Sequence, residues 1–266
     1  MDLKKLTGKV SFVSYPRIIV ICGPTRTGTT ALSHTFIRAG LESHMQPIKS
    51  ILRALEDNHE APIWRLNGNP DRTILTKETM GAKHDSEYFN PIEILVDLGY
   101  PPDLILPILM VRDPAQTFSS WQELWGDFSG NRFIQAYHQM MLIRHYCDQH
   151  GIRYLSFVHE SIRANPADLV TGQVFKFCQV EHSPREVIDW HQAPKFGDDD
   201  PGNAHLYFYD EPPEKFIAGV RNWGGYTFRE RPVSDEALAF VAANDGLSLV
   251  YSTFAGHCER DLSITI

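Results

Sequence analysis

A loop rich in glycine and threonine, with one arginine inside it, offers the clearest chemistry in the chain. It belongs to the segment RIIVICGPTRTGTT at residues 17–30, where an apolar β-branched run precedes it and a helical pattern follows. The first N–H groups of a helix have no partner within the helix, and the helix dipole favours negative charge there. The segment therefore predicts a site for a phosphate-like anion. Its expected residues are Thr25, Arg26, Thr27, Gly28, Thr29 and Thr30.

The spacing within this loop differs from two common nucleotide-binding fingerprints. Gly23 and Gly28 have the spacing of the nucleoside triphosphatase P-loop, but Thr29 stands where that motif needs a lysine. The G-x-G-x-x-G spacing of dinucleotide-binding loops is absent. For the loop taken alone, an ordinary strand-to-helix connection capped by Thr27 or Thr29 is the alternative interpretation.

A second segment, ILMVRDPAQTFSSW at residues 108–121, has a similar organisation. An apolar strand is expected to end at Val111, and a helix to begin just after Asp113. Ligands of parallel sheets bind at the carboxyl ends of the strands. Arg112 and Ser120 could hold a phosphate there, through a guanidinium fork and a hydroxyl. The alternative is a surface pair of Arg112 with Asp113, and a serine that caps the helix or faces water.

Together the two segments resemble the sulfotransferases that use 3′-phosphoadenosine 5′-phosphosulfate (PAPS). In that family a loop of the form xxxRSGTT holds the 5′-phosphosulfate, and GPTRTGTT at residues 23–30 is similar to it. A strand that ends in Arg-Asp-Pro, with a serine eight residues after the arginine, holds the 3′-phosphate. Arg112 and Ser120 have that spacing and order. The resemblance implies a P-loop-like sulfotransferase fold.

Two further segments extend the resemblance. TKET at residues 76–79 is similar to a lysine-containing strand end of membrane-type and tyrosylprotein sulfotransferases. Residues 216–228 loosely resemble the loop that closes on the 3′-phosphate, and Arg221 is the cation there. The resemblance implies transfer of a sulfuryl group from PAPS to a hydroxyl or amine of a small-molecule acceptor, with release of PAP and no requirement for a metal. An in-line reaction with a loose transition state, as in phosphoryl transfer, is expected.

Such a reaction needs positive charge at the bridging oxygen and a base for the acceptor's proton. Arg26 and Lys77 are the candidates for the charge, although arginine does not readily donate a proton. The candidate bases are Glu78, beside Lys77, then His84 in the following loop, and His44 after the first helix. The sequence leaves the choice among these three open.

Size and composition restrict the class of protein. With 266 residues the chain can form one sizeable core, and its net charge of −8 argues against non-specific binding of nucleic acid. Its longest apolar runs are too short to span a bilayer. Four scattered cysteines without metal-type spacing favour reduced thiols and a cytoplasmic location. The oligomeric state is left open.

Alternating strand and helix patterns predict an α/β fold, a central parallel sheet flanked by helices, in a single domain over residues 1–266. Pro107 lies inside an expected strand, which must therefore start after it or bulge there. An irregular segment at residues 190–215, rich in proline and aromatic residues, is expected to form a lid or substrate loop. The expected strands are 17–23, 73–77, 105–111 and 152–158, and the expected helices 29–39, 48–58, 90–98, 115–125, 132–150, 166–178 and 234–254.

Two other functions compete with the sulfotransferase interpretation. A P-loop kinase-like phosphotransferase would share the strand, loop and helix, but Thr29 replaces its lysine and no strand ends in an obvious magnesium-binding aspartate. A non-catalytic nucleotide-binding module could keep the same fold without the reaction. The presence of Arg26, Arg112 and Ser120 argues against that loss of function.

Overall fold

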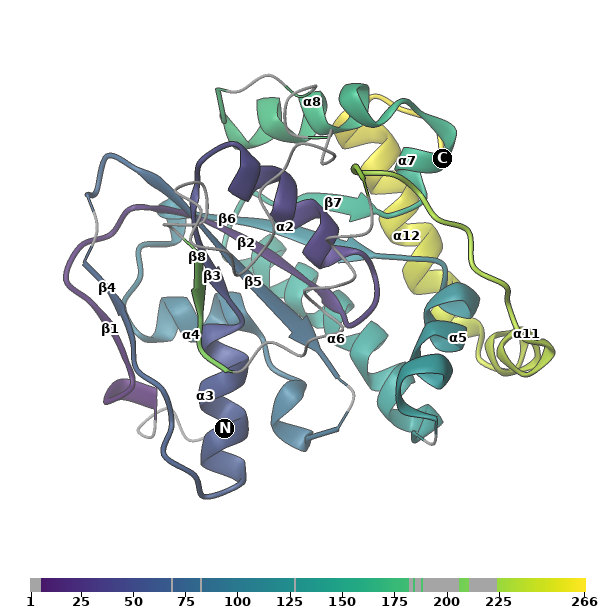
Figure 1. The fold of residues 1–266 in the computed structure, drawn as a ribbon, viewed down its shortest axis with the longest axis horizontal. Helices are drawn as coiled ribbons and strands as arrows, with labels where there is room; N and C mark the ends of the chain where they lie inside the picture. The colour runs from purple at the N-terminus through teal and green to yellow at the C-terminus, as the bar shows by residue number, and fades with distance from the viewer. Residues whose placement is uncertain are drawn as a thin grey trace.

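Six parallel strands form the centre of the protein, in the order β7-β6-β2-β5-β3-β8 (Figure 1). The structure is a computed structural model that describes residues 6–67, 69–81, 83–126, 128–181, 184, 188, 206–210 and 224–266. The strands of this sheet are β2 (Arg17–Pro24), β3 (Glu42–Met45), β5 (Thr73–Met80), β6 (Ile105–Val111), β7 (Leu155–Val158) and β8 (Leu206–Phe208). A second, two-stranded parallel sheet pairs β1 (Val10–Phe12) with β4 (Trp64–Leu66). The predicted α/β class with a central parallel sheet is confirmed.

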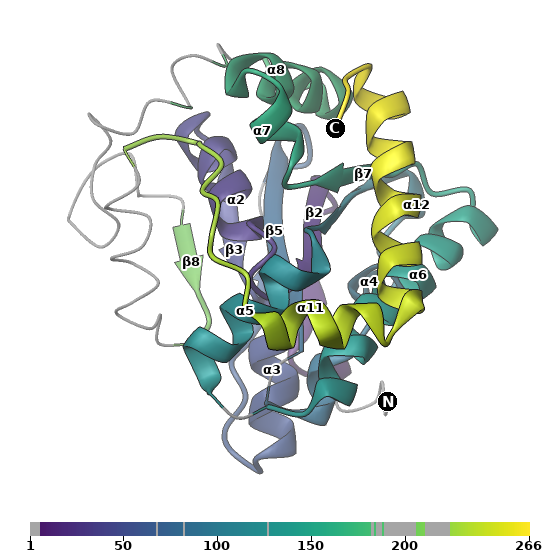
Figure 2. The same ribbon diagram turned by 90° about the vertical axis from the view of Figure 1, so that its right-hand side faces the viewer.

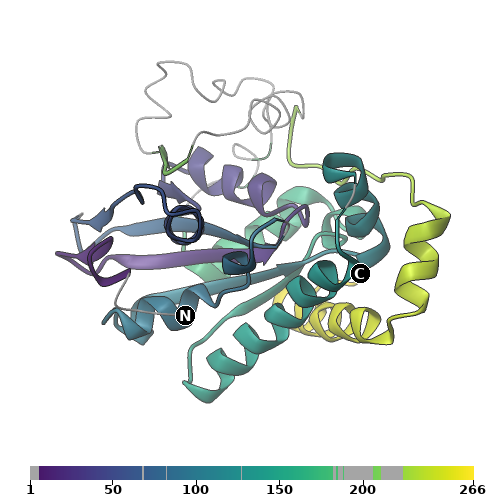
Figure 3. The same cartoon turned by 90° about the horizontal axis from the view of Figure 1, so that it is seen from below.

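Helices cover both faces of the central sheet. On one face α2 packs against β2 and β5, and on the other α4 and α6 pack against β2 (Figure 3). Helix α12 packs against β7 and crosses it (Figure 2). The helices are α2 (Thr29–Arg38), α3 (Pro47–Glu56), α4 (Pro91–Asp97), α5 (Pro114–Trp125), α6 (Gly130–Gln149), α7 (Ser161–Ala164), α8 (Ala167–Cys178), α11 (Asp235–Ala242) and α12 (Asp245–Leu262), with short 3₁₀ turns η1 (Asp85–Glu87) and η2 (Pro102–Leu104).

Strands β2 and β6 are buried apolar runs, as expected for a sheet that is covered on both faces. Pro107 lies within β6, directly opposite Val20 of β2, and the register on both sides of it is unbroken. The predictions of a later strand start or a bulge at Pro107 were therefore wrong. Strand β7 begins to pair with β6 only at Ile108, so the missing N–H of Pro107 breaks no bond to β7.

Several element boundaries also differ from expectation, and strand β5 runs to Met80, three residues beyond the predicted end. The single helix predicted over residues 234–254 is two helices, α11 and α12, with an 89° bend between them. The break falls at Asn244, which takes a non-helical conformation and donates from its side chain to the carbonyl of Phe240 over 2.7 Å. Strand β7 starts at Leu155, three residues later than predicted.

Strand β8 comes from the segment predicted as a lid, residues 190–215. Of that segment the structure describes residues 206–210, and the rest lies outside the described residues. Strand β8 pairs in parallel with β3 and so forms one end of the strand order. Across the described part of the chain, no helix on its own has the length and apolar character needed to cross a membrane.

Candidate functional site

The loop after β2 turns through two left-handed residues. Arg26 has φ of 75° and Gly28 has φ of 92°. Gly28 is the N-cap of α2, and among the described residues no side chain caps this helix, so the predicted capping alternative is wrong. A Cβ on Gly28 would lie 2.6 Å from Nδ1 of His159, so the position needs glycine for space as well as for conformation. The N–H groups at Thr29 and Thr30 open α2 without a capping side chain, as an anion site requires.

Two threonines of the loop fix the loop itself. The hydroxyl of Thr25 donates to the carbonyl of Met80 over 3.1 Å, and the hydroxyl of Thr27 donates to the carbonyl of Pro24 over 2.8 Å. The indole N–H of Trp121 donates to the carbonyl of Thr25 over 2.7 Å. The hydroxyls of Thr25 and Thr27 thus hold the backbone of the loop in place.

The two predicted anion-binding segments meet through a side-chain hydrogen bond. Nε of Arg26 donates to the hydroxyl of Ser120 over 2.9 Å, across 94 residues of sequence. One turn earlier on α5, the amide oxygen of Gln116 accepts from Nη2 of Arg112 over 2.6 Å. Because residues four apart lie on one face of a helix, α5 presents Gln116 and Ser120 side by side. The two arginines therefore contact neighbouring positions of one helix.

Arg112 follows β6 and is only 5% exposed. Its guanidinium also donates to the carbonyl of Arg229 over 3.3 Å, and its Nε lies 3.9 Å from a carboxylate oxygen of Glu160. Nε finds no hydrogen-bond acceptor in the described residues, and burial lowers the pKa of this guanidinium. The side chain of Asp113 instead caps α5 by accepting from the N–H of Gln116 over 2.8 Å. The predicted alternative, a surface pair of Arg112 with Asp113, is therefore wrong.

The C-terminal segment predicted to close on the 3′-phosphate reaches this site with its last residues. The ring centroid of Phe228 lies 5.8 Å from the guanidinium carbon of Arg112 and 5.3 Å from the ring of His159. Arg221, the predicted cation of that segment, lies outside the described residues. The described part of the segment therefore packs against the end of β6.

At the carboxyl end of β5, neighbouring residues have separate roles. Lys77 is 3% exposed, and burial followed by repulsion from Lys49 lowers its pKa to about 7. The carboxylate of Glu78 accepts from the N–H groups of Ile48 and Lys49, over 2.9 and 3.2 Å, at the start of α3. Burial raises the pKa of Glu78, and this effect outweighs the two hydrogen bonds, which lower it. Glu78, a predicted base, is thus anchored to a helix N-terminus.

Lys49 is a buried cation that the sequence analysis did not identify. Its Nζ donates to the hydroxyl of Thr79 and the carbonyl of Gly81, each over 3.2 Å, and lies 3.7 Å from a carboxylate oxygen of Glu87. Burial lowers its pKa. The available signal was its place near the start of α3, because a cation there opposes the helix dipole and needs another reason to be present.

The two other predicted bases occupy different environments. His84 follows β5, is 27% exposed at its side chain, and has Nδ1 3.6 Å from a carboxylate oxygen of Asp57. His44 lies within β3 and has partners at both ring nitrogens: the hydroxyl of Tyr209 at 2.7 Å and the carboxylate of Glu42 at 3.1 Å. His44 therefore joins β8 to β3, whereas His84 keeps an accessible edge.

A histidine that the sequence analysis did not select lies beside the anion loop. His159 directly follows β7, and its Nδ1 is buried without a hydrogen-bond partner in the part of the chain that the structure describes. Burial, followed by repulsion from Arg112, lowers its pKa to about 3, so the ring is neutral at physiological pH. Its position at the carboxyl end of an apolar run was the signal that could have identified it.

The geometry collects cations at the carboxyl ends of β2, β5 and β6, which are neighbours in the sheet. Such an arrangement can bind an anion with more than one charged group. Among the described residues no group of three or more His, Cys, Asp or Glu is placed to hold a metal ion. No protein-family model matches the chain, and no curated protein matches it at a significant level.

Proposed function

We propose that this protein is a PAPS-dependent sulfotransferase with the P-loop-like sulfotransferase architecture, acting on a hydroxyl or amine of a small-molecule acceptor. The hydrogen bond from Arg26 to Ser120 is the observation that carries the proposal. It links two segments that the resemblance to PAPS-dependent sulfotransferases assigns separately to the two phosphate-bearing ends of one nucleotide. A loop with a purely structural role would not need a partly buried cation at that junction.

The residues present fit the charge of PAPS. The N-terminus of α2, which no described side chain caps, and the guanidinium of Arg26 suit the 5′-phosphosulfate. Arg112, whose Nε lacks an acceptor among the described residues, and the hydroxyl of Ser120 suit the 3′-phosphate. PAPS supplies the activated sulfuryl group when it is bound.

Lys77 and Arg26 have complementary roles in this proposal. Arg26 stabilises negative charge that develops on the leaving phosphate, because a guanidinium keeps its proton. Lys77, with a pKa of about 7, exists in both protonation states near neutral pH and can deliver a proton to the bridging oxygen. Lys49, in hydrogen-bond contact with Thr79, adds a second cation near Lys77.

Glu78 and His84 are the proposed bases for the acceptor's proton. The raised pKa of the Glu78 carboxyl suits a proton acceptor that works near neutral pH, but its oxygens accept from backbone N–H groups of α3. His84 is the more accessible of the two. Glu78→Gln and His84→Gln variants distinguish the two candidates. The variant that lacks the base should lose turnover, while its affinity for PAP stays unchanged.

The proposal is tested by calorimetric titration of the protein with PAP, PAPS and ATP, followed by transfer of radiolabelled sulfate from PAPS to a panel of alcohols, phenols and amines. Tight binding of PAP and PAPS, weak binding of ATP and transfer of label support it. Preference for ATP with transfer of its terminal phosphate would instead establish a kinase-like phosphotransferase. Nucleotide binding with no transfer across the panel would favour a non-catalytic nucleotide-binding module.

A further inference from the structure

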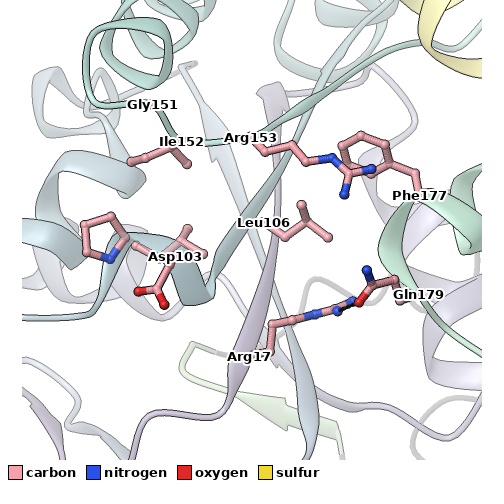
Figure 4. A pocket seen from close by; sticks show the side chains of 10 residues that line it. Arg17, Asp103, Leu106, Gly151, Ile152, Arg153, Phe177 and Gln179 are labelled. Carbon is pink, nitrogen blue, oxygen red and sulfur yellow. Dashed lines mark hydrogen bonds between the residues drawn. The ribbon is translucent and has the colours of Figure 1, made fainter.

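A cavity of about 340 Å³ lies at the opposite edge of the central sheet, where the strands begin (Figure 4). This volume falls within the range of roughly 300–1,000 Å³ found for small-molecule sites. Its walls come from the start of β2, from η2 and the start of β6, from the loop before β7, and from the end of α8. The lining residues that matter here are Arg17, Asp103, Leu106, Arg153, Phe177 and Gln179.

The cavity is separate from the candidate catalytic site. Arg17 begins β2, and Pro24 ends that strand just before the anion loop. At a rise of about 3.3 Å per residue, the two ends of β2 are roughly 20 Å apart. A molecule in the cavity therefore does not contact the anion loop.

Arg17 has unused hydrogen-bonding capacity beside this cavity. Its Nη1 donates to the side-chain oxygen of Gln179 over 2.5 Å. Its Nε and Nη2 are buried and, within the described residues, find no acceptor. Buried donors of a charged group are costly when they are left unsatisfied. An anionic oxygen in the cavity would relieve that cost once the guanidinium of Arg17 turns these two nitrogens toward it.

A second guanidinium lies on the same side of the cavity. The guanidinium carbon of Arg153 is 4.1 Å from the ring centroid of Phe177, a cation–π contact that holds this exposed side chain over the ring. Figure 4 shows Leu106 between Arg17 and Arg153, with Asp103 across the cavity from them. Two cations against one carboxylate give this cavity a positive balance in a chain whose net charge is −8.

We propose that this cavity binds a small organic anion. Its carboxylate or phosphate group meets Arg17 and Arg153, and its flat apolar body lies against Leu106. Guanidinium forks favour such anionic groups, and the apolar wall favours a ring over a bare inorganic ion. The inference is independent of the sulfotransferase proposal, because it uses none of the residues at the carboxyl edge of the sheet.

Phenyl phosphate is a suitable probe, with benzyl alcohol as its uncharged counterpart. In a nuclear magnetic resonance titration of the full chain, phenyl phosphate should shift the amide signals of Leu106, Ile152 and Phe177 in a saturable way. Arg17→Gln should weaken this binding by roughly tenfold or more. Asp103→Asn should strengthen it, because it removes the opposing carboxylate. Arg260→Gln, at an exposed arginine of α12, is the matched control and should leave the affinity unchanged.

Three results would overturn the inference. Shifts confined to residues 25–30 would place phenyl phosphate at the anion loop instead. Equal binding of benzyl alcohol would remove the requirement for an anion. Unchanged affinity in Arg17→Gln would exclude the proposed contact. If Arg17→Gln fails to fold, Arg153→Gln replaces it, because Arg153 is solvent-exposed and its loss is expected to leave the fold intact.

Discussion

Arg112 is held by its surroundings before any ligand arrives. Gln116 and the carbonyl of Arg229 accept from one of its nitrogens, and Glu160 lies near another. Tyr137 fixes the backbone, since its hydroxyl donates to the carbonyl of Arg112 over 2.7 Å. A side chain placed in this way loses little conformational entropy when it binds a phosphate. Arg112 is therefore suited to binding and positioning a phosphate group more than to assisting bond breaking.

Ser120→Ala and Arg112→Ala test the predicted 3′-phosphate site. Each should raise the dissociation constant of PAP, Arg112→Ala by at least tenfold, because hydrogen bonds to charged groups contribute about 1.5–3 kcal/mol. Ser119→Ala is the matched control, since the neighbouring hydroxyl of Ser119 accepts from the N–H of Ser234 and has no part in the predicted site. Calorimetric affinities that are the same for Ser120→Ala and Ser119→Ala would remove Ser120 from the site.

Lys77→Met should act mainly on turnover. The substitution keeps an unbranched side chain on β5 but removes the charge and the proton, so kcat should fall by roughly a hundredfold or more. The KM for PAPS should change little, because the proposal assigns binding of the nucleotide to the loop and Arg112, which the substitution leaves intact. Steady-state kinetics check this. A rise in KM with unchanged kcat would show that Lys77 binds substrate and does not assist bond breaking.

His159 predicts a pH dependence of stability with a definite sign. In the folded protein the pKa of His159 is lowered from 6.5 to about 3, so between those pH values the unfolded chain binds more protons. Stability contributed by this residue is therefore lost as the pH falls through that window. Between pH 7 and pH 5 the loss amounts to about 2 kcal/mol.

Urea denaturation at both pH values checks this dependence. The His159→Gln variant should lose about 2 kcal/mol less than the wild type between pH 7 and pH 5. His59→Gln, at an exposed histidine, should follow the wild type. Parallel losses in wild type and His159→Gln would contradict the burial of a neutral imidazole.

At the scale of elements, the two N-caps of α4 and α6 make contrasting predictions. The side chain of Asn90 accepts from the N–H groups of Ile92 and Glu93 at the start of α4. Ser129 stands at the N-cap of α6 without a side-chain cap bond to the described residues. Asn90→Ala should therefore cost about 1 kcal/mol of unfolding free energy, and Ser129→Ala much less. Chemical denaturation at neutral pH compares the two. Equal losses would show that capping does not determine the stability of α4.

Element prediction succeeded where local pattern and burial agree. The apolar runs of β2 and β6 and the proline near the start of α5 are local signals, and the structure places elements there. Strands β3 and β8 carry polar residues such as His44, whose burial comes from pairing between distant segments. Periodicity within one segment does not predict pairing with a distant segment. The bend at Asn244 was not predicted, because the segments on both sides have helical patterns and the turn preference of a single asparagine is a weak signal.

The candidate site was only partly predictable for a related reason. Side chains at strand ends could be placed at one edge of the sheet from the alternation of strands and helices alone. The contact of Arg26 with Ser120 depends on how α5 packs against the loop. Local sequence patterns do not predict that packing orientation. Lys49 and His159 each carried a local signal, but only the packing of α3 and β7 in the fold brings them beside the predicted residues.

For the whole molecule, the binding of PAP should appear as thermal stabilisation. A ligand at 100 times its dissociation constant adds about 2.7 kcal/mol to the folded state, which corresponds to roughly 5 to 10 °C in Tm for a protein of this size. ATP at the same concentration should give a much smaller shift, since it lacks a 3′-phosphate for Arg112. Scanning calorimetry measures both. Equal shifts for PAP and ATP would mean that the protein does not recognise the 3′-phosphate.

The central claim is that one nucleotide bridges the carboxyl ends of β2 and β6, and a crystal structure with PAP tests it most directly. The account predicts the 5′-phosphate at the start of α2, against Thr29 and Arg26, and the 3′-phosphate against Arg112 and Ser120. PAP bound at another surface, or density for only one phosphate at this edge of the sheet, would contradict it.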